Sequence, residues 1–175
     1  IKALCFAPAA RIRNPVPAVN LSFSGNEFTF VAGESISAGQ VCYVNTDGKM
    51  YKADATNSAK YPAQFICEAA VSTDQSQLFG ALGVMRNDAW SWTPGGTIYL
   101  STTSGGLTQT PPSTTGNIIQ VVGWAISADV MFVNIAAQLS IKLDPQEFPL
   151  PSEKCQEKLK FYFKELSDCV NNIYI

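Results

Sequence analysis

The chain has 175 residues, of which 46% are hydrophobic and only 15% are charged, and its formal net charge is −2 at pH 7. This length allows one principal domain with a substantial core, with or without an appendage. A weak negative charge without a basic cluster disfavours nucleic-acid binding. No apolar run approaches the roughly 18–20 residues that cross a bilayer, and the opening residues are too rich in Pro for a signal peptide. We therefore expect a soluble protein with neither a nucleic-acid nor a membrane partner.

Residues 1–27 are predicted to form an extended N-terminal arm. Pro8, Pro15 and Pro17 disfavour both a helix interior and a central strand in this segment. We expect the arm to lie against a neighbouring subunit or a larger assembly. Arg11 and Arg13, the densest basic pair before the last quarter of the chain, would there meet acidic partners and form part of an interface with other copies or with a capsid.

Residues 28–136 carry the pattern of an all-β domain. Short apolar runs rich in Val, Ile, Tyr, Phe and Thr are separated by Gly, Pro, Asn and Asp at intervals of about 8–12 residues. This pattern predicts a small antiparallel β-barrel or sandwich without a long helix. The expected strands cover residues 27–31, 40–45, 49–53, 64–70, 79–85, 97–101, 107–109, 118–126 and 130–135.

A hairpin motif occurs twice within this domain. The stretch "ISAGQVCYVNTDGKMYKADAT" at residues 36–56 has the same skeleton as "TPGGTIYLSTTSGGLTQTPPST" at residues 93–114. At an offset of about 56 positions Gly39 falls on Gly95 and Tyr43 on Tyr99. The Asp-Gly and Gly-Gly pairs supply the positive φ angles that tight hairpin turns require. We therefore predict a domain built from a duplicated hairpin unit.

The last quarter of the chain differs in composition from the β-domain. Residues 137–151 contain three prolines and are predicted to form a stiff linker. Residues 152–175 begin with a capping Ser and repeat apolar residues at spacings of three and four, which predicts an amphipathic helix. Because an isolated helix of this length is marginal in water, we expect it to dock on the domain or on another chain, and in the functional hypothesis below its apolar face packs across chains. The residues predicted for this interface are Leu159, Phe163, Leu166 and Val170.

The sequence offers no recognisable catalytic or metal-binding machinery. The chain contains no His, which excludes Ser-His-Asp and Cys-His catalysis and removes the commonest metal ligand. The five cysteines are widely spaced and form no CxxC pair, so we expect buried thiols rather than a zinc site or disulfides. We predict a protein that is not an enzyme and that has no catalytic residue, no metal and no cofactor. Five aspartates that could in principle serve a glycosidase are expected instead in turns and at strand ends: Asp47, Asp54, Asp74, Asp88 and Asp129.

The tryptophans allow two interpretations. Trp90 and Trp92 alternate, so in a strand they would share one face. Together with Trp124 they could form a platform on which sugars stack, flanked by the polar loops at residues 57–60 and 111–117. Alternatively, they seal the core or a subunit interface, because Trp is enriched at both.

The order of "AGESISAGQVCYVNTDGKMYKADATNSAKYPAQFICEA" and then "TPGGTIYLSTTSGGLTQTPPSTTGNIIQVVGWAISADVMFVNI" resembles the C-terminal β-domains of tailed-bacteriophage virion proteins. These include head fibres, capsid decoration or cement proteins and some tail-fibre tips. The resemblance covers roughly residues 32–135, and the helical appendage departs from the family pattern. It implies a small β-barrel or sandwich that associates, typically as a trimer, on the outside of a virion.

These observations lead to one functional hypothesis and two alternatives. The hypothesis is a non-enzymatic virion structural protein, made in the host cytoplasm, that decorates or projects from a phage capsid as a homo-oligomer, expected to be a homotrimer. Its partners would be its own copies and the major capsid protein or other virion proteins. The first alternative is the receptor-binding tip of a phage fibre, which would bind host-surface glycan through Trp90, Trp92 and the polar loops. The composition also permits a secreted lectin-like domain of a cell.

Overall fold

The computed structural model describes residues 15–135 and 139–141, which form ten β-strands and no helix. The expected all-β class is therefore confirmed for this part of the chain. The arm residues 1–14, the linker residues 142–151 and the expected helix at residues 152–175 lie outside the described residues. The strands are β1 (Ser22–Val31), β2 (Val41–Val44), β3 (Met50–Lys52), β4 (Phe65–Cys67), β5 (Ser76–Arg86), β6 (Thr97–Leu100), β7 (Leu107–Thr108), β8 (Ile118–Ala125), β9 (Val130–Asn134) and β10 (Leu139–Ile141).

Nine of these strands coincide with the segments expected from the sequence, and two differences concern the ends of the domain. Strand β1 begins at Ser22 rather than at Glu27, because its Gly- and Asn-containing first half pairs in register with the end of β5. Strand β10 was not expected. It lies in the predicted linker and pairs with β8, so a long-range contact decides its conformation.

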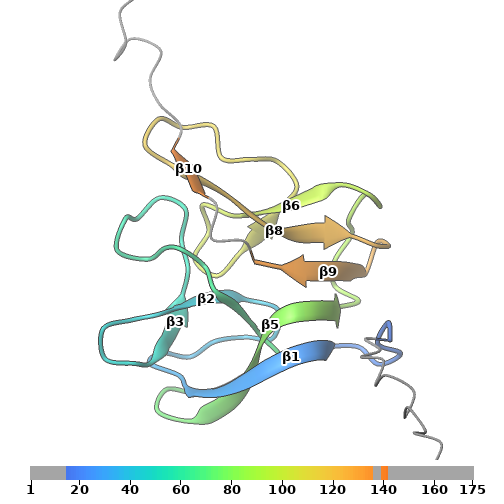
Figure 1. Ribbon diagram of the computed structural model, residues 1–175, viewed down its shortest axis with the longest axis horizontal. Coiled ribbons are helices and arrows are strands. Elements are labelled where there is room, and N and C mark those ends of the chain that lie inside the picture. Colours follow the sequence, from blue (N-terminus) through green and yellow to red (C-terminus); the bar gives the residue numbers. More distant parts are fainter. Residues whose placement is uncertain (1–14, 136–138, 142–175) are drawn as a thin grey trace, which may run out of the picture. The chain divides into compact units, whose positions relative to one another are not determined.

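The strands form one antiparallel sheet that curls into a half-barrel (Figure 1). Along the sheet the order is β3-β2-β4-β5-β9-β8-β6-β7, while β1 pairs with β5 and β10 pairs with β8. The turn between β6 and β7 contacts the opposite end of the sheet. Gly105 accepts a hydrogen bond from the Val41 N–H at 3.0 Å and donates one to the Ala53 carbonyl at 2.7 Å. These bonds link the two ends of the curled sheet.

The strand order is symmetrical about the contact between β5 and β9. Reading outward from that contact, β5 is followed by β4, β2 and β3, and β9 is followed by β8, β6 and β7. The two hairpins have the same register. Val44 of β2 pairs with Met50 of β3, and Leu100 of β6 pairs with Leu107 of β7.

The glycines of the two hairpins also occupy matching conformations. Gly39 and Gly95 have φ angles of 79° and 77°, in the left-handed region that favours glycine. Each donates its N–H to the last residue of the corresponding strand of its half: Gly39 to the Cys67 carbonyl of β4 at 2.8 Å, and Gly95 to the Ala125 carbonyl of β8 at 2.9 Å. The two segments of similar sequence thus make the same local contacts.

The core consists of two groups of buried apolar residues. The larger group lies between β1, the long strands β5, β8 and β9, and the hairpin strands that face them, and includes Val41, Met85, Leu100 and Met131. The smaller group lies beneath β2, β3 and β4 and includes Phe79. The two groups lie on opposite faces of β2 and β4, because consecutive strand residues alternate between them: Val41 and Ile66 belong to the larger group, and Cys42 and Cys67 belong to the smaller one.

Candidate interaction surfaces

Within residues 15–135 and 139–141, no group of three or more His, Cys, Asp or Glu side chains is placed to hold a metal ion. The same residues include no helix long and apolar enough to span a membrane. The features that follow are charged groups, tryptophans, an apolar strip and a groove on the surface of the domain.

The aspartates of the first hairpin make local turn contacts. Asp47 accepts a hydrogen bond from the Lys49 N–H at 3.0 Å and another from the Tyr51 hydroxyl at 2.9 Å. The Lys49 N–H bond is the main reason that the pKa of Asp47 is lowered. Lys49 in turn forms an ion pair with Asp74 at 2.6 Å. These carboxylates are thus occupied in holding the hairpin tip and the β4–β5 connection.

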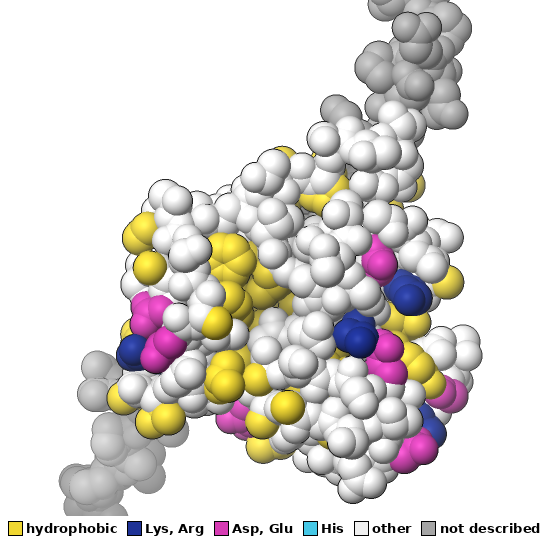
Figure 2. All heavy atoms as spheres, turned by 180° about the vertical axis from the view of Figure 1, so that it is seen from behind, with side chains coloured by type: hydrophobic (Ala, Val, Ile, Leu, Met, Phe, Trp, Pro, Cys, Tyr) yellow, Lys and Arg dark blue, Asp and Glu magenta, His cyan; other side chains and the backbone are white. Residues whose placement is uncertain are grey.

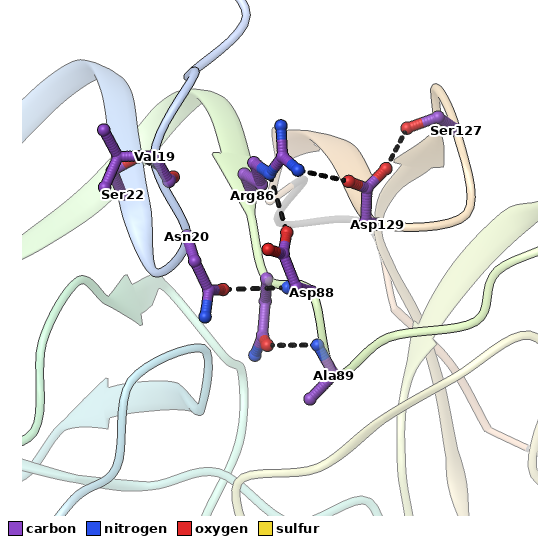
Figure 3. Close-up of polar contacts among 9 residues, drawn as sticks. Val19, Asn20, Ser22, Arg86, Asp88, Ala89, Ser127 and Asp129 are labelled. Carbon is purple, nitrogen blue, oxygen red and sulfur yellow. Dashed lines mark hydrogen bonds and ion pairs between the residues drawn. The ribbon is translucent and has the colours of Figure 1, made fainter.

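A second charged group connects three loops at the end of β5 (Figure 3). The Arg86 guanidinium lies 2.6 Å from a carboxylate oxygen of Asp88 and 3.1 Å from one of Asp129. Asp129 also accepts a hydrogen bond from the Ser127 hydroxyl at 2.7 Å, and this bond is the first cause of its lowered pKa. Asn20 accepts the Asp88 N–H at 2.8 Å. The group fixes the start of the loop that carries the tryptophans.

Basic side chains on the described surface mostly lie beside acidic ones. Besides the two groups above, Lys52 lies 3.5 Å from Glu34. Figure 2 shows one face of the domain, on which hydrophobic side chains gather near the middle and charged side chains lie next to partners of opposite sign. Such pairing leaves little free charge to attract an ionic ligand.

Trp90 and Trp92 lie in the connection between β5 and β6, not in a strand as their alternation suggested. Their ring centroids are 5.5 Å apart at an interplanar angle of 47°. Both side chains are partly buried against the larger core group. The Trp92 Nε1 atom is buried and has no hydrogen-bond partner in the described part of the chain. This placement favours the interpretation that the pair seals the core.

Trp124 is the exposed tryptophan, and it belongs to an apolar strip on the outside of the sheet. It lies opposite Phe132 of β9, and the two rings stack with centroids 6.1 Å apart. Phe132 lies opposite Val84 of β5, and Leu82 follows on the same face two positions along. We call Leu82, Val84, Trp124 and Phe132 the outer strip. Trp124 and Leu82 remain 40% and 39% exposed, although neither carries a charge.

Strand β1 adds an unpaired edge next to the outer strip. It pairs along its whole length with β5, and no other strand among the described residues pairs with it. Phe28 on this strand is 51% exposed. Glu27 is the strand's single charged residue, and its pKa is raised by burial and by the nearby Glu68. Natural proteins usually protect long edge strands with charges or Pro, and this one has little such protection.

A groove lined by hydroxyl groups lies beside β6 and β7. Its volume is about 240 Å³. The lining residues, which we call the hydroxyl groove, are Ser101, Thr102, Thr108, Thr110, Pro111, Pro112, Ser113, Thr114 and Asn117. The expected polar loop at residues 111–117 thus forms one wall. The other expected loop, at residues 57–60, and the two tryptophans Trp90 and Trp92 are not part of the lining.

Sequence reasoning missed the outer strip and the wall of the groove that faces residues 111–117. A signal for the strip was present, since Trp124 alternates with buried residues in a strand, but its exposure depends on the strands beside it. The residues predicted for an oligomer or capsid interface lie outside the described residues: Arg11, Arg13, Leu159, Phe163, Leu166 and Val170.

Comparison of the chain with models of protein families finds no match, and a search of curated proteins finds no significant relative.

Proposed function

We propose that the protein is a non-enzymatic virion structural protein that decorates or projects from a bacteriophage capsid and assembles as a homo-oligomer, with three copies the expected number. The observation that carries the proposal is the uncharged outer strip beside the unpaired β1 edge. The resemblance of residues 32–135 to β-domains of phage virion proteins supplies the biological setting. The partners are other copies of the chain and the major capsid protein or another virion protein.

The outer strip has the properties of a subunit contact. Trp and Phe side chains are enriched at protein interfaces, whose centres are depleted in charged residues. Trp124 stacked on Phe132 presents a large and rigid apolar area at small entropic cost. A neighbouring copy that covered the strip would also shield the β1 edge from uncontrolled pairing.

We also propose that the domain arose from two copies of one hairpin unit. Support comes from the symmetrical strand order, the equal registers of the two hairpins and the matching bonds of Gly39 and Gly95. Such a repeated unit gives a small domain whose sheet closes without metal or disulfides. That suits a building block made in many copies.

The oligomer is tested by light scattering and sedimentation of the full chain. We expect a stable oligomer for the wild type and a shift to monomer for Trp124→Arg, because the added charge would be buried without a partner. Ser58→Arg, at an exposed position in the 57–60 loop, is the matched control and should leave the oligomer intact. Circular dichroism checks that each variant is folded.

Retention on particles tests the virion assignment separately. Purified capsids incubated with the protein should retain the wild type after sedimentation. A monomeric wild type that capsids also fail to retain would overturn the proposed function.

A second candidate function is recognition of host-surface glycan by a fibre tip, and the hydroxyl groove is the observation that favours it. A glycan array probed with the wild type and with Trp90→Ala tests this candidate. Absence of binding to every glycan would rule strongly against it. Because Trp90 packs on the core, the Trp90→Ala result is interpreted only if that variant remains folded.

A further inference from the structure

One side chain that lines the hydroxyl groove makes no hydrogen bond within the described part of the chain. Asn117 is 8% exposed and lines the groove. Its backbone N–H bonds the Thr114 carbonyl at 3.1 Å, but its side-chain amide makes no hydrogen bond to any described residue. An Asn amide offers two donors and one acceptor. Among the described residues the buried polar side-chain atom without a partner is Trp92 Nε1, so the Asn117 amide is open to the groove, where a ligand could replace water.

The walls of the groove are held in place by their own hydrogen bonds. Ser101 donates its N–H to the Gly106 carbonyl at 3.0 Å and accepts the Thr103 N–H at its hydroxyl at 3.1 Å. Thr108 and Thr110 are joined by two bonds, of 3.1 and 3.2 Å, that use the Thr108 hydroxyl. A site whose walls are already fixed loses little conformational freedom when a ligand binds.

The chemistry of the lining selects a neutral ligand rich in hydroxyl groups. No lining residue is charged, so an ion would find no counter-charge. The hydroxyls of Thr102, Thr110, Ser113 and Thr114 bond no other described residue and can each donate and accept. The rings of Pro111 and Pro112 add apolar C–H surface. Alternating hydroxyl groups and C–H faces are the chemistry of a sugar ring.

We propose that the hydroxyl groove binds a neutral saccharide and that the Asn117 amide pairs with two adjacent sugar hydroxyls. The groove volume of about 240 Å³ is below the roughly 300–1,000 Å³ of sites for drug-sized ligands, which limits the ligand to about one sugar ring at a time. This inference goes beyond the structural role proposed above. It rests on the second candidate function, for which it specifies the site and the class of ligand.

Titration of the ¹⁵N-labelled full chain with a panel of neutral mono- and disaccharides, followed by NMR, tests the proposal. We expect saturable shifts confined to the amides of residues 101–117. Asn117→Ala should weaken binding at least about tenfold, because two hydrogen bonds are lost. Thr110→Val, which keeps the shape and removes one hydroxyl, should weaken it by less. Asn57→Ala, in the polar loop outside the groove, should bind as the wild type does.

The outcomes separate this inference from the function on which it rests. Saturable binding with shifts around Trp124 instead of residues 101–117 would overturn the groove assignment and leave glycan recognition standing. Binding in the groove that is unchanged by both Asn117→Ala and Thr110→Val would also overturn it. If no saccharide binds the wild type, both the groove assignment and the second candidate function fail. Thermal unfolding of each variant shows whether a loss of binding reflects a loss of fold.

Discussion

Gln120 on β8 holds the backbone of Ala63 with two hydrogen bonds across the interior of the domain. Its side-chain oxygen accepts the Ala63 N–H at 2.9 Å, and its side-chain nitrogen donates to the Ala63 carbonyl at 2.8 Å. Both residues are almost fully buried. Gln109 makes the same pair of bonds to Thr93, at 2.8 and 2.9 Å, but at an exposed position. The chain therefore contains the same pair of side-chain to backbone hydrogen bonds twice, once buried at Gln120 and once exposed to solvent at Gln109. We call each pair a clamp.

Replacing Gln120 by Leu should destabilise the protein by about 2–4 kcal/mol, because the N–H and the carbonyl of Ala63 would both be left buried without partners. Gln109→Leu should cost about 0.5–1 kcal/mol, since water can take over the bonds to Thr93. Urea unfolding of the two variants measures the difference. Equal losses of unfolding free energy in the two variants would show that burial does not determine how much these hydrogen bonds stabilise the fold.

Gly123 allows β8 and β9 to approach closely, and we expect Gly123→Ala to cost at least about 3 kcal/mol. A Cβ at this position would come within 1.9 Å of the Phe132 carbonyl oxygen, so the strands would have to separate. Gly95→Ala is the control, because Gly95 has a positive φ but open space around it. It should cost about 1–2 kcal/mol for the backbone conformation alone. Thermal unfolding distinguishes the two, and a mild effect of Gly123→Ala would contradict the observed strand spacing.

The stability of the domain should fall in acid partly through Asp129. Its pKa is lowered from an ordinary value of 3.8, first by the Ser127 hydroxyl and also by Arg86. Because the folded state binds the proton less tightly, Asp129 stabilises the fold above pH 3.8, and this contribution disappears as the pH falls through the lower folded pKa. Unfolding midpoints measured down a pH series should therefore decline less steeply for Asp129→Asn than for the wild type. If the unfolding midpoints of the wild type and of Asp129→Asn fell equally with pH, Asp129 would not contribute to the loss of stability in acid.

The thiols of Cys42 and Cys67 should not react in the folded protein. Both are buried, and burial raises the pKa of Cys42 well above its usual range and that of Cys67 to about 12. At pH 8 almost all Cys67 thiols would therefore be protonated and unreactive. In a variant whose other cysteines, Cys5, Cys155 and Cys169, are changed to Ser, iodoacetamide should label neither residue until denaturant is added. Rapid labelling under native conditions would show that this part of the core opens readily.

The strands were predictable because their signals are local. Asp-Gly and Gly-Gly pairs, here Asp47-Gly48 and Gly105-Gly106, favour hairpin turns. The runs of β-branched and aromatic residues between such turns favour strands. The beginning of β1 was not predictable in this way. Gly25 and Asn26 are weak strand formers, and they are extended because the end of β5 lies beside them.

The candidate surfaces were less predictable, since they depend on which strands become neighbours. Alternation of Trp90 and Trp92 suggested a strand face, but Asn87 starts a turn by accepting the Ala89 N–H, and the tryptophans follow it into a loop. Trp124 is exposed because it faces outward opposite Phe132. Residues 111–117 were recognised as a polar loop, whereas the opposite wall of the groove comes from the β6–β7 turn and β7.

The bonds that Gly105 makes to Val41 and Ala53 have a consequence for the folding reaction. They join chain segments that are distant in sequence, so they can form only after a large loop has lost its freedom, and such contacts form late and slowly. Closure at Gly105 therefore adds long-range contacts to the fold, and we expect it to slow folding relative to a domain of local contacts.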